Sequence, residues 1–179
     1  MLCTTNIWIK IQKCAIPHKN LYFLPTFVPE NSSQETKKMA LSETLYGKTP
    51  EQLAAVCAEL GMPRFAAKQL ARWLYAKHVE GPMRMSDIAA AHRAKLAERF
   101  RPAFTPPARI TESADGTKKY LYRTQQGAWI ESAYIPDGER ATLCVSSQAG
   151  CRMGCKFCAT GRQGLQHSLT TAEILNQIV

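Results

Sequence analysis

Apolar residues recur every three or four positions around the second quarter of the chain, which is the spacing of amphipathic helices. The first predicted helix follows Thr49, a hydroxyl N-cap with proline at the next position and glutamine three residues on, and it ends at Gly61. A second helix is expected from Pro63, and Ser86 is expected to cap a third. The apolar positions are Leu53, Val56, Cys57, Leu60, Phe65, Ala66, Leu70, Trp73, Leu74, Ile88, Ala91 and Leu96. They predict a small helical domain over residues 39–101, with Cys57 and Trp73 in its core.

Beyond the helical region the hydrophobic pattern alternates with period two, which is typical of strands. Prolines at 102, 106 and 107 mark a connector between the two patterns. Alternating residues on both sides of Asp115-Gly116 predict a β-hairpin, and a third strand is expected over 128–135. Asp137-Gly138 then turns the chain into the next strand. We therefore predict a linker and an antiparallel β extension over residues 102–140.

The last part of the chain, residues 141–179, predicts a strand, a loop and a helix. The strand is Ala141–Ser147, and Thr170 with Glu173 forms a capping box that opens the helix. A strand and helix in this order form the repeating unit of an α/β barrel, which needs on the order of 200 residues. The predicted fold class is thus α+β to α/β, and we expect an amino-terminal fragment with an incomplete barrel. In such a fragment the strand would have unpaired edges, and the helix would expose Ile174, Leu175 and Ile178.

The first 38 residues differ in composition from the rest. Pro17, Pro25 and Pro29 interrupt a brief apolar alternation, and 31–38 has the polar composition of a linker. The segment lacks the charged start and apolar core of a secretory signal. We expect residues 1–38 to be a disordered extension without a function of its own, and Met39 to be the natural start.

The composition is that of a globular protein: 179 residues, 45% hydrophobic and 21% charged. Its longest apolar runs are too short for a membrane-spanning helix, so no membrane partner is expected. The net charge of +9 permits binding to a polyanion, although a solvated basic surface would give the same value. Seven cysteines, an odd number with irregular spacing outside one cluster, argue against a disulfide framework and favour a reducing, cytoplasmic location.

Three of the cysteines, Cys151, Cys155 and Cys158, lie in a C-x3-C-x2-C pattern on the loop after the predicted strand. Thiolates are preferred ligands of both iron–sulfur clusters and zinc. A structural zinc site would need a fourth ligand, and neither Cys144 nor His167 completes a familiar zinc spacing. Three thiolates suit a cluster with one open iron, and this is the favoured prediction. Zinc, or three structural cysteines, remains an alternative.

The cysteine motif, with Phe157 before its third cysteine, resembles the cluster loop of radical S-adenosylmethionine enzymes. The wider run from Glu131 through Tyr134-Ile-Pro to Gly164 is similar to that of the RlmN-type RNA methyltransferases. This family methylates C2 of an adenine in 23S ribosomal RNA and in transfer RNA. The resemblance extends from about Tyr46 to the end of the chain and is densest over 131–164.

The resemblance implies cofactors and roles for particular residues. Cys151, Cys155 and Cys158 would hold a 4Fe-4S cluster, whose open iron would bind S-adenosylmethionine. Glu131 matches the family's proton acceptor, although its residue type alone predicts only a solvent-facing side chain or a salt bridge. Cys144 matches a cysteine that forms a transient disulfide with a methyl-carrying cysteine nearer the carboxyl terminus, yet a lone cysteine is also commonly a small buried hydrophobic residue.

The implied partners are ribosomal and transfer RNA and an electron donor such as flavodoxin or ferredoxin, with the protein itself a monomer. Arg64, Lys68 and Arg72 form a basic stripe that would meet RNA phosphates, or would simply be solvated. Two other functions stay open: the related adenine-C8 methyltransferases that confer antibiotic resistance, and a non-catalytic RNA-binding module with zinc. The fragment itself is expected to be inactive alone.

Overall fold

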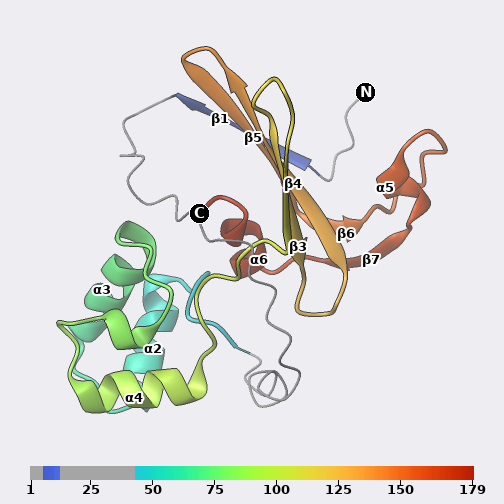
Figure 1. The fold of residues 1–179 in the computed structure, drawn as a ribbon. Helices are drawn as coiled ribbons and strands as arrows, with labels where there is room; N and C mark the ends of the chain where they lie inside the picture. The colour runs from blue at the N-terminus through green and yellow to red at the C-terminus, as the bar shows by residue number, and fades with distance from the viewer. Residues whose placement is uncertain (1–5, 13–42) are drawn as a thin grey trace, which may run out of the picture.

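The computed structural model describes residues 6–12, as a strand, and residues 43–179. These residues form a helical domain, a five-stranded antiparallel sheet above it, and a carboxyl-terminal segment that packs between and beside them (Figure 1). The predicted fold class is confirmed. The predicted start at Met39, with Cys3 and Cys14, lies outside the described residues.

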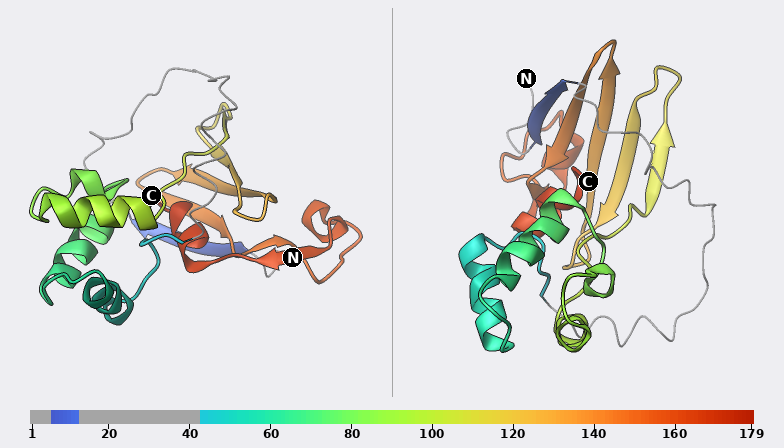
Figure 2. Two further views of the ribbon diagram at one scale, coloured as in Figure 1. Left: turned by 90° about the horizontal axis from the view of Figure 1, so that it is seen from below. Right: turned by 90° about the vertical axis from the view of Figure 1, so that its left-hand side faces the viewer.

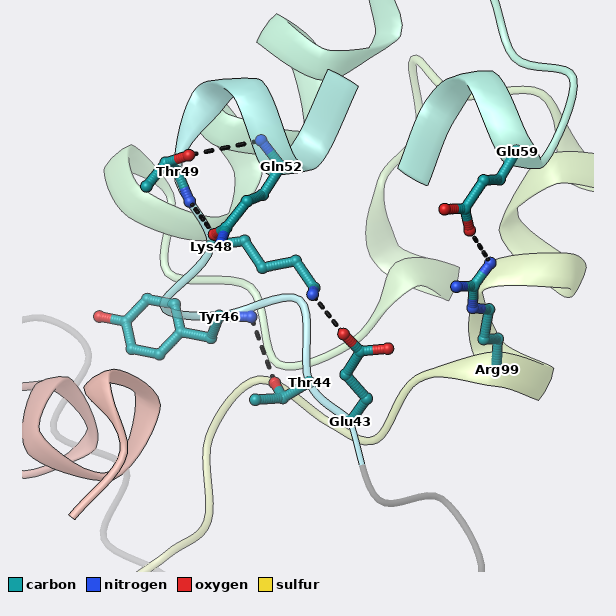
Figure 3. Close-up of polar contacts among 8 residues, drawn as sticks. All are labelled: Glu43, Thr44, Tyr46, Lys48, Thr49, Gln52, Glu59 and Arg99. Carbon is teal, nitrogen blue, oxygen red and sulfur yellow. Dashed lines mark hydrogen bonds and ion pairs between the residues drawn. The ribbon is translucent and has the colours of Figure 1, made fainter. Parts of the chain in front are cut away.

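The first helix, α2 (Pro50–Glu59), begins as its sequence predicts. Thr49 Oγ1 accepts from Gln52 N at 3.3 Å, and Gln52 Oε1 accepts from Thr49 N at 2.8 Å, which completes the capping box (Figure 3). Gly61 takes a φ of +66° just past the end, where a residue without Cβ has no steric cost. The buried face of α2 consists of Leu53, Val56 and Cys57.

The second and third helices differ from the prediction in detail. Helix α3 (Ala66–Ala71) continues without a break into one π-helical turn, η2 (Arg72–Ala76). Helix α4 (Ala90–Arg99) starts after Ala89, and a short 3-10 turn, η3 (Pro82–Arg84), precedes it. The prediction that Ser86 caps this helix is therefore wrong. The segment 85–88 instead turns to bury its apolar members and to place Asp87 where its carboxylate accepts from the indole of Trp73.

The helical domain has one continuous core. It includes the predicted Cys57 and Trp73 and adds Met85 and Phe100. At its surface, Glu43 pairs with Lys48, and Glu59 pairs with Arg99 at 2.6 Å (Figure 3). Exposed pairs of this kind contribute little to stability, so apolar burial in the core holds the domain together.

The sheet contains the predicted hairpins. Strands β2 (Arg109–Glu112), β3 (Lys118–Arg123), β4 (Trp129–Asp137) and β5 (Arg140–Ser146) follow one another as antiparallel neighbours. Gly116 and Gly127 supply the positive φ angles of the first two turns, +79° and +86°. The strand predicted at Ala141–Ser147 is thus confirmed as β5, with a one-residue shift at each end.

Strand β5 is not a sheet edge. A further strand, β1 (Asn6–Gln12), pairs antiparallel with β5 on the side opposite β4, with Asn6 opposite Ser146 and Gln12 opposite Arg140. The sheet order is β1-β5-β4-β3-β2. Two expectations are corrected here: the extension contributes a strand over residues 6–12, and β5 has partners on both sides. The rest of the extension lies outside the described residues.

Between β5 and the last helix, the chain forms elements that the sequence pattern did not reveal. Strands β6 (Gln148–Gly150) and β7 (Leu165–Ser168) pair antiparallel, with the short helix α5 (Ala159–Arg162) between them. Gly150 makes this pairing possible: with φ at +74°, a Cβ there would lie 1.8 Å from the carbonyl oxygen of Gly164. Each strand is too short to show a hydrophobic period.

Helix α6 (Thr171–Asn176) joins the helical domain to the sheet, and Figure 1 shows it between the two. It starts at the predicted Thr170 capping box. Leu175 packs against the core of the helical domain, and Ile174 packs against the apolar cluster under the sheet. The expected exposed stripe is therefore wrong for these two residues, and only Ile178 is exposed.

Candidate functional site

The three predicted cluster cysteines lie on the loop between β6 and α5. Cys151 follows β6 directly and is buried, whereas Cys155 and Cys158 are half-buried. The loop folds back on itself: Met153 N lies 3.4 Å from Cys151 Sγ, and Cys158 N donates to Cys155 O at 3.0 Å. The loop therefore has one anchored cysteine at its base and two more accessible cysteines above it.

Helix α5 supports this loop from behind. A Cβ at Gly161 would lie 2.9 Å from both the backbone nitrogen and the backbone oxygen of Cys155. Arg162 Nε also donates to Lys156 O at 3.0 Å. Sequence reasoning did not find this support, and the glycine in Ala159-Thr-Gly-Arg162 was its only signal. Any larger residue at 161 would displace the middle cysteine.

The positions of the three thiols bear on which metal group the loop could hold. In residues 43–179 no three His, Cys, Asp or Glu side chains gather around a point that could hold one metal ion. A single zinc ion requires all its thiolates about 2.3 Å from one centre, and the three thiols of the loop are not gathered in that way in the described residues. In a 4Fe-4S cluster each cysteine binds a different iron, so the three thiols stand further apart than around one metal ion. Three thiols on one short loop, two of them accessible, fit that group.

Glu131 and Cys144 lie on neighbouring strands with their side chains on the same face of the sheet. Ala133 on β4 lies opposite Cys144 on β5, and side chains two residues apart on a strand share a face. Glu131 is thus a diagonal neighbour of Cys144, and such neighbours lie about 7–8 Å apart. Ser146 Oγ donates to the backbone oxygen of Glu131 at 2.8 Å and ties the two strands at this point.

The environments of these two side chains differ. Cys144 is buried, and burial raises the pKa of its thiol, so the neutral form is favoured. The Glu131 carboxylate is exposed and forms no ion pair within residues 43–179. Among residues 43–179, the salt bridge that the sequence left open for Glu131 does not form, and these residues leave its carboxylate available to a ligand on this face.

The opposite face of the sheet, the core face, is covered. Strand β6 and helix α6 lie against it (Figure 2), and its apolar cluster includes Tyr122, Ile130, Ala149 and Leu169. Burial, then the neighbouring Tyr120, raises the pKa of Tyr122 to about 12, with the Ser132 hydroxyl acting in the other direction. The sheet that carries Glu131 is therefore packed against an apolar cluster on its other face.

The predicted basic stripe is exposed. Arg64 precedes α3, Lys68 lies within it, and Arg72 begins the π-helical turn. None of the three forms an ion pair within the described part of the helical domain. The structure leaves their charges available to a polyanion, and no described helix is long and apolar enough to span a membrane.

The fold and the cysteine loop together define a class. A solved radical SAM methyltransferase from Sphaerobacter thermophilus shares this fold with a TM-score of 0.69 and 37% sequence identity, over 76% of this chain and 40% of that chain. Residues 44–101 match the family described as "Ribosomal RNA large subunit methyltransferase N-terminal domain".

Two curated relatives carry the name RlmN. The chain is 50% identical over 134 residues to the probable dual-specificity RNA methyltransferase RlmN of Parabacteroides distasonis, covering 75% of this chain and 39% of that protein. Against the RlmN of Halorhodospira halophila the identity is 43% over 134 residues, covering 75% of this chain and 37% of that protein. The chain belongs to the RlmN family of radical SAM methyltransferases. It spans about two fifths of the length of the curated relatives it matches.

Proposed function

We propose that this chain supplies the helical domain, the β extension and the cluster loop of a radical S-adenosylmethionine methyltransferase that methylates C2 of an adenine in 23S ribosomal RNA and in transfer RNA. One observation carries the proposal: Glu131 and Cys144 share a face on neighbouring strands, and β5 leads through β6 directly into the three-cysteine loop. The relatives, named as dual-specificity RNA methyltransferases, support the substrate class.

Cys151, Cys155 and Cys158 are the proposed ligands of a 4Fe-4S cluster. When bound, this cluster with S-adenosylmethionine supplies the radical chemistry and the methyl group. The chain positions the cluster by anchoring Cys151 at the end of β6 and by backing Cys155 with Gly161. An external electron donor of the flavodoxin or ferredoxin type would reach the exposed side of this loop, where Phe157 is 78% exposed.

Glu131 is the proposed proton acceptor. Its carboxylate is exposed on the sheet face and has no competing ion pair among the described residues, so it can take the proton from C2 of an adenine placed above it. The Ser146 hydroxyl donates to the backbone carbonyl of Glu131, so the Glu131 carboxylate remains free to accept a proton.

Cys144 is proposed to form a transient disulfide with a methyl-carrying cysteine of the complete enzyme. Its raised pKa keeps it a thiol until a base or a partner sulfur approaches, which suits a residue that must act late in the reaction. Arg64, Lys68 and Arg72 are proposed RNA phosphate contacts. A monomer in the cytoplasm, where such thiols stay reduced, completes the proposal.

Cluster binding is tested by anaerobic reconstitution of the 179-residue chain. We expect about four irons per chain, with loss of the cluster on replacing Cys151, Cys155 or Cys158 by alanine. Cys144→Ala is the matched control, because it removes a nearby buried cysteine outside the loop, and it should retain its iron. Iron loss in Cys144→Ala, or zinc as the retained metal, would contradict the ligand assignment.

Methylation is tested with the chain joined to the remaining part of a relative. Glu131→Gln should still consume S-adenosylmethionine but release no C2-methylated RNA, because an amide cannot accept the proton. Product analysis would also separate C2 from C8 methylation, the alternative that this chain leaves open. Full turnover by Glu131→Gln would refute its role.

A further inference from the structure

The Glu131 face of the sheet carries a cluster of cations around an exposed aromatic ring. Strand register puts Trp129 opposite Arg123, Leu121 opposite both Glu131 and Arg109, and Lys119 opposite Ala133. Side chains directly opposite one another in an antiparallel pair lie on the same face. This face therefore presents a surface whose members are Arg109, Lys119, Arg123, Trp129 and Glu131; we call it the Trp129 surface.

Each feature of this surface is open to a ligand. Trp129 is 50% exposed, which is unusual for a residue of this size, and its three cationic neighbours are also exposed. None of these three cations forms an ion pair within residues 43–179, whereas Lys118, one residue away on the opposite face, pairs with Glu112 at 3.5 Å. Three cations against one carboxylate give the surface a positive charge.

Arg123 contacts the Trp129 ring and restrains its position. The Arg123 guanidinium carbon lies 5.9 Å from the centroid of the Trp129 ring, within cation–π range, and its Nη2 lies 4.0 Å from where a Cβ of Gly127 would be. Arg123 thus folds over the turn between β3 and β4 and restrains the indole from one side. The exposed part of the ring is available for stacking.

We propose that the Trp129 surface binds a single-stranded segment of RNA, with one base stacked on Trp129 and its flanking phosphates on Arg109, Lys119 and Arg123. Positive grooves with aromatic side chains are the usual means of binding unpaired nucleotides, and charge complementarity selects a polyanion here. Trp129 and Glu131 are about 6.7 Å apart along the strand, so a base on Trp129 would leave its neighbour beside Glu131.

The inference rests on the proposed function for its choice of RNA, but its test does not. The probe is a fluorescently labelled, unstructured oligoribonucleotide of about ten nucleotides, titrated with the 179-residue chain without S-adenosylmethionine and followed by anisotropy. Trp129→Ala should weaken binding by about fivefold to 150-fold, and Trp129→Phe should restore most of it, because a phenyl ring still stacks. A duplex of the same sequence should not show this dependence on Trp129.

The cations have a matched control on the same strand. Lys119→Gln and Arg123→Gln should each reduce the slope of log affinity against log salt by about 0.7, as expected for one lost phosphate contact to a single strand. Lys118→Gln removes an equal charge from the other face and should leave the slope unchanged. Thermal melting of each variant checks that the fold is retained.

The outcomes separate this inference from the proposed function. Binding of Trp129→Ala within about twofold of the parent, or equal losses for Lys118→Gln and Lys119→Gln, would overturn the Trp129 surface as an RNA site. Equal dependence on Trp129 for the duplex would overturn it as a single-strand site. Failure of methylation with Trp129-dependent binding intact would instead count against the proposed reaction and uphold the surface.

Discussion

Replacing Gln177 by alanine should destabilise the whole chain, because this buried side chain links the end of α6 to strand β5. Its Oε1 accepts from Ser146 N at 2.8 Å, and its Nε2 donates to Ser146 O at 2.8 Å and to Glu173 O at 3.2 Å. Gln177 is only 4% exposed, so water does not replace these bonds readily when the side chain is removed.

The magnitude follows from the two bonds to β5. Each contributes about 1 kcal/mol net, and backbone groups left without that partner in a buried site add to the loss, so Gln177→Ala should cost about 2–4 kcal/mol. For a chain of this size, that lowers the thermal midpoint by about 5–15 °C. The assay is thermal and urea unfolding followed by circular dichroism, in which both midpoints should fall together.

Two comparisons make this prediction specific. Gln163→Ala removes an exposed glutamine with no hydrogen bond of its side chain among those of the described residues, and it should leave the midpoint unchanged. Asn176→Ala, which removes two exposed bonds to the backbone of Thr105, should give an intermediate loss. If Gln177→Ala unfolds at the same temperature as Gln163→Ala, the bonds of Gln177 to Ser146 do not stabilise the fold.

Three further predictions follow from the fold. Gly150→Ala should lower the urea midpoint far more than Gly138→Ala does. Both glycines have a positive φ, but only at position 150 would the new Cβ meet a carbonyl oxygen, at 1.8 Å. Equal losses would show that φ alone determines the effect. The pKa of Tyr122 should be about 12 in the folded chain, against 10.0 for an ordinary tyrosine, so its contribution to stability is present below pH 10 and is lost as the pH rises through 12. Spectrophotometric titration of the parent and of Tyr122→Phe checks this. A midpoint near pH 10 for Tyr122 would contradict its burial. Deleting residues 1–38 should expose the β5 edge that β1 covers and speed amide exchange in β5, although not in α2; unchanged exchange would show that β1 contributes nothing in solution.

Local signals in the sequence were sufficient for several elements. Thr49 and Thr170 each open a helix through a capping box, and Asp115-Gly116 closes the first hairpin, because these motifs are completed by residues within three or four positions. The same reasoning failed at Ser86. There the burial of Met85 and Ile88 and the bond between Asp87 and Trp73 outweigh a local preference for a cap.

The chemistry of the candidate site was also visible in the sequence, since three cysteines at this spacing need no fold to indicate a metal group. The backbone contacts that support the cysteine loop were not visible in the sequence. Gly161 behind Cys155 and the pairing of β6 with β7 depend on backbone segments that approach one another only after folding. The strand at 6–12 was missed for the same reason, because its partner β5 lies more than a hundred residues further along the chain.

The sequence by itself determined the capped helices α2 and α6, the hairpin strands up to β5, the cysteine loop and its resemblance to one family. Only the tertiary structure decided that Glu131, Cys144 and Trp129 share one face of the sheet, and that α6 joins the two cores. Alternation within a strand sets which residues lie together on that strand. The register between strands, which sets their neighbours across the sheet, depends on contacts between distant parts of the chain.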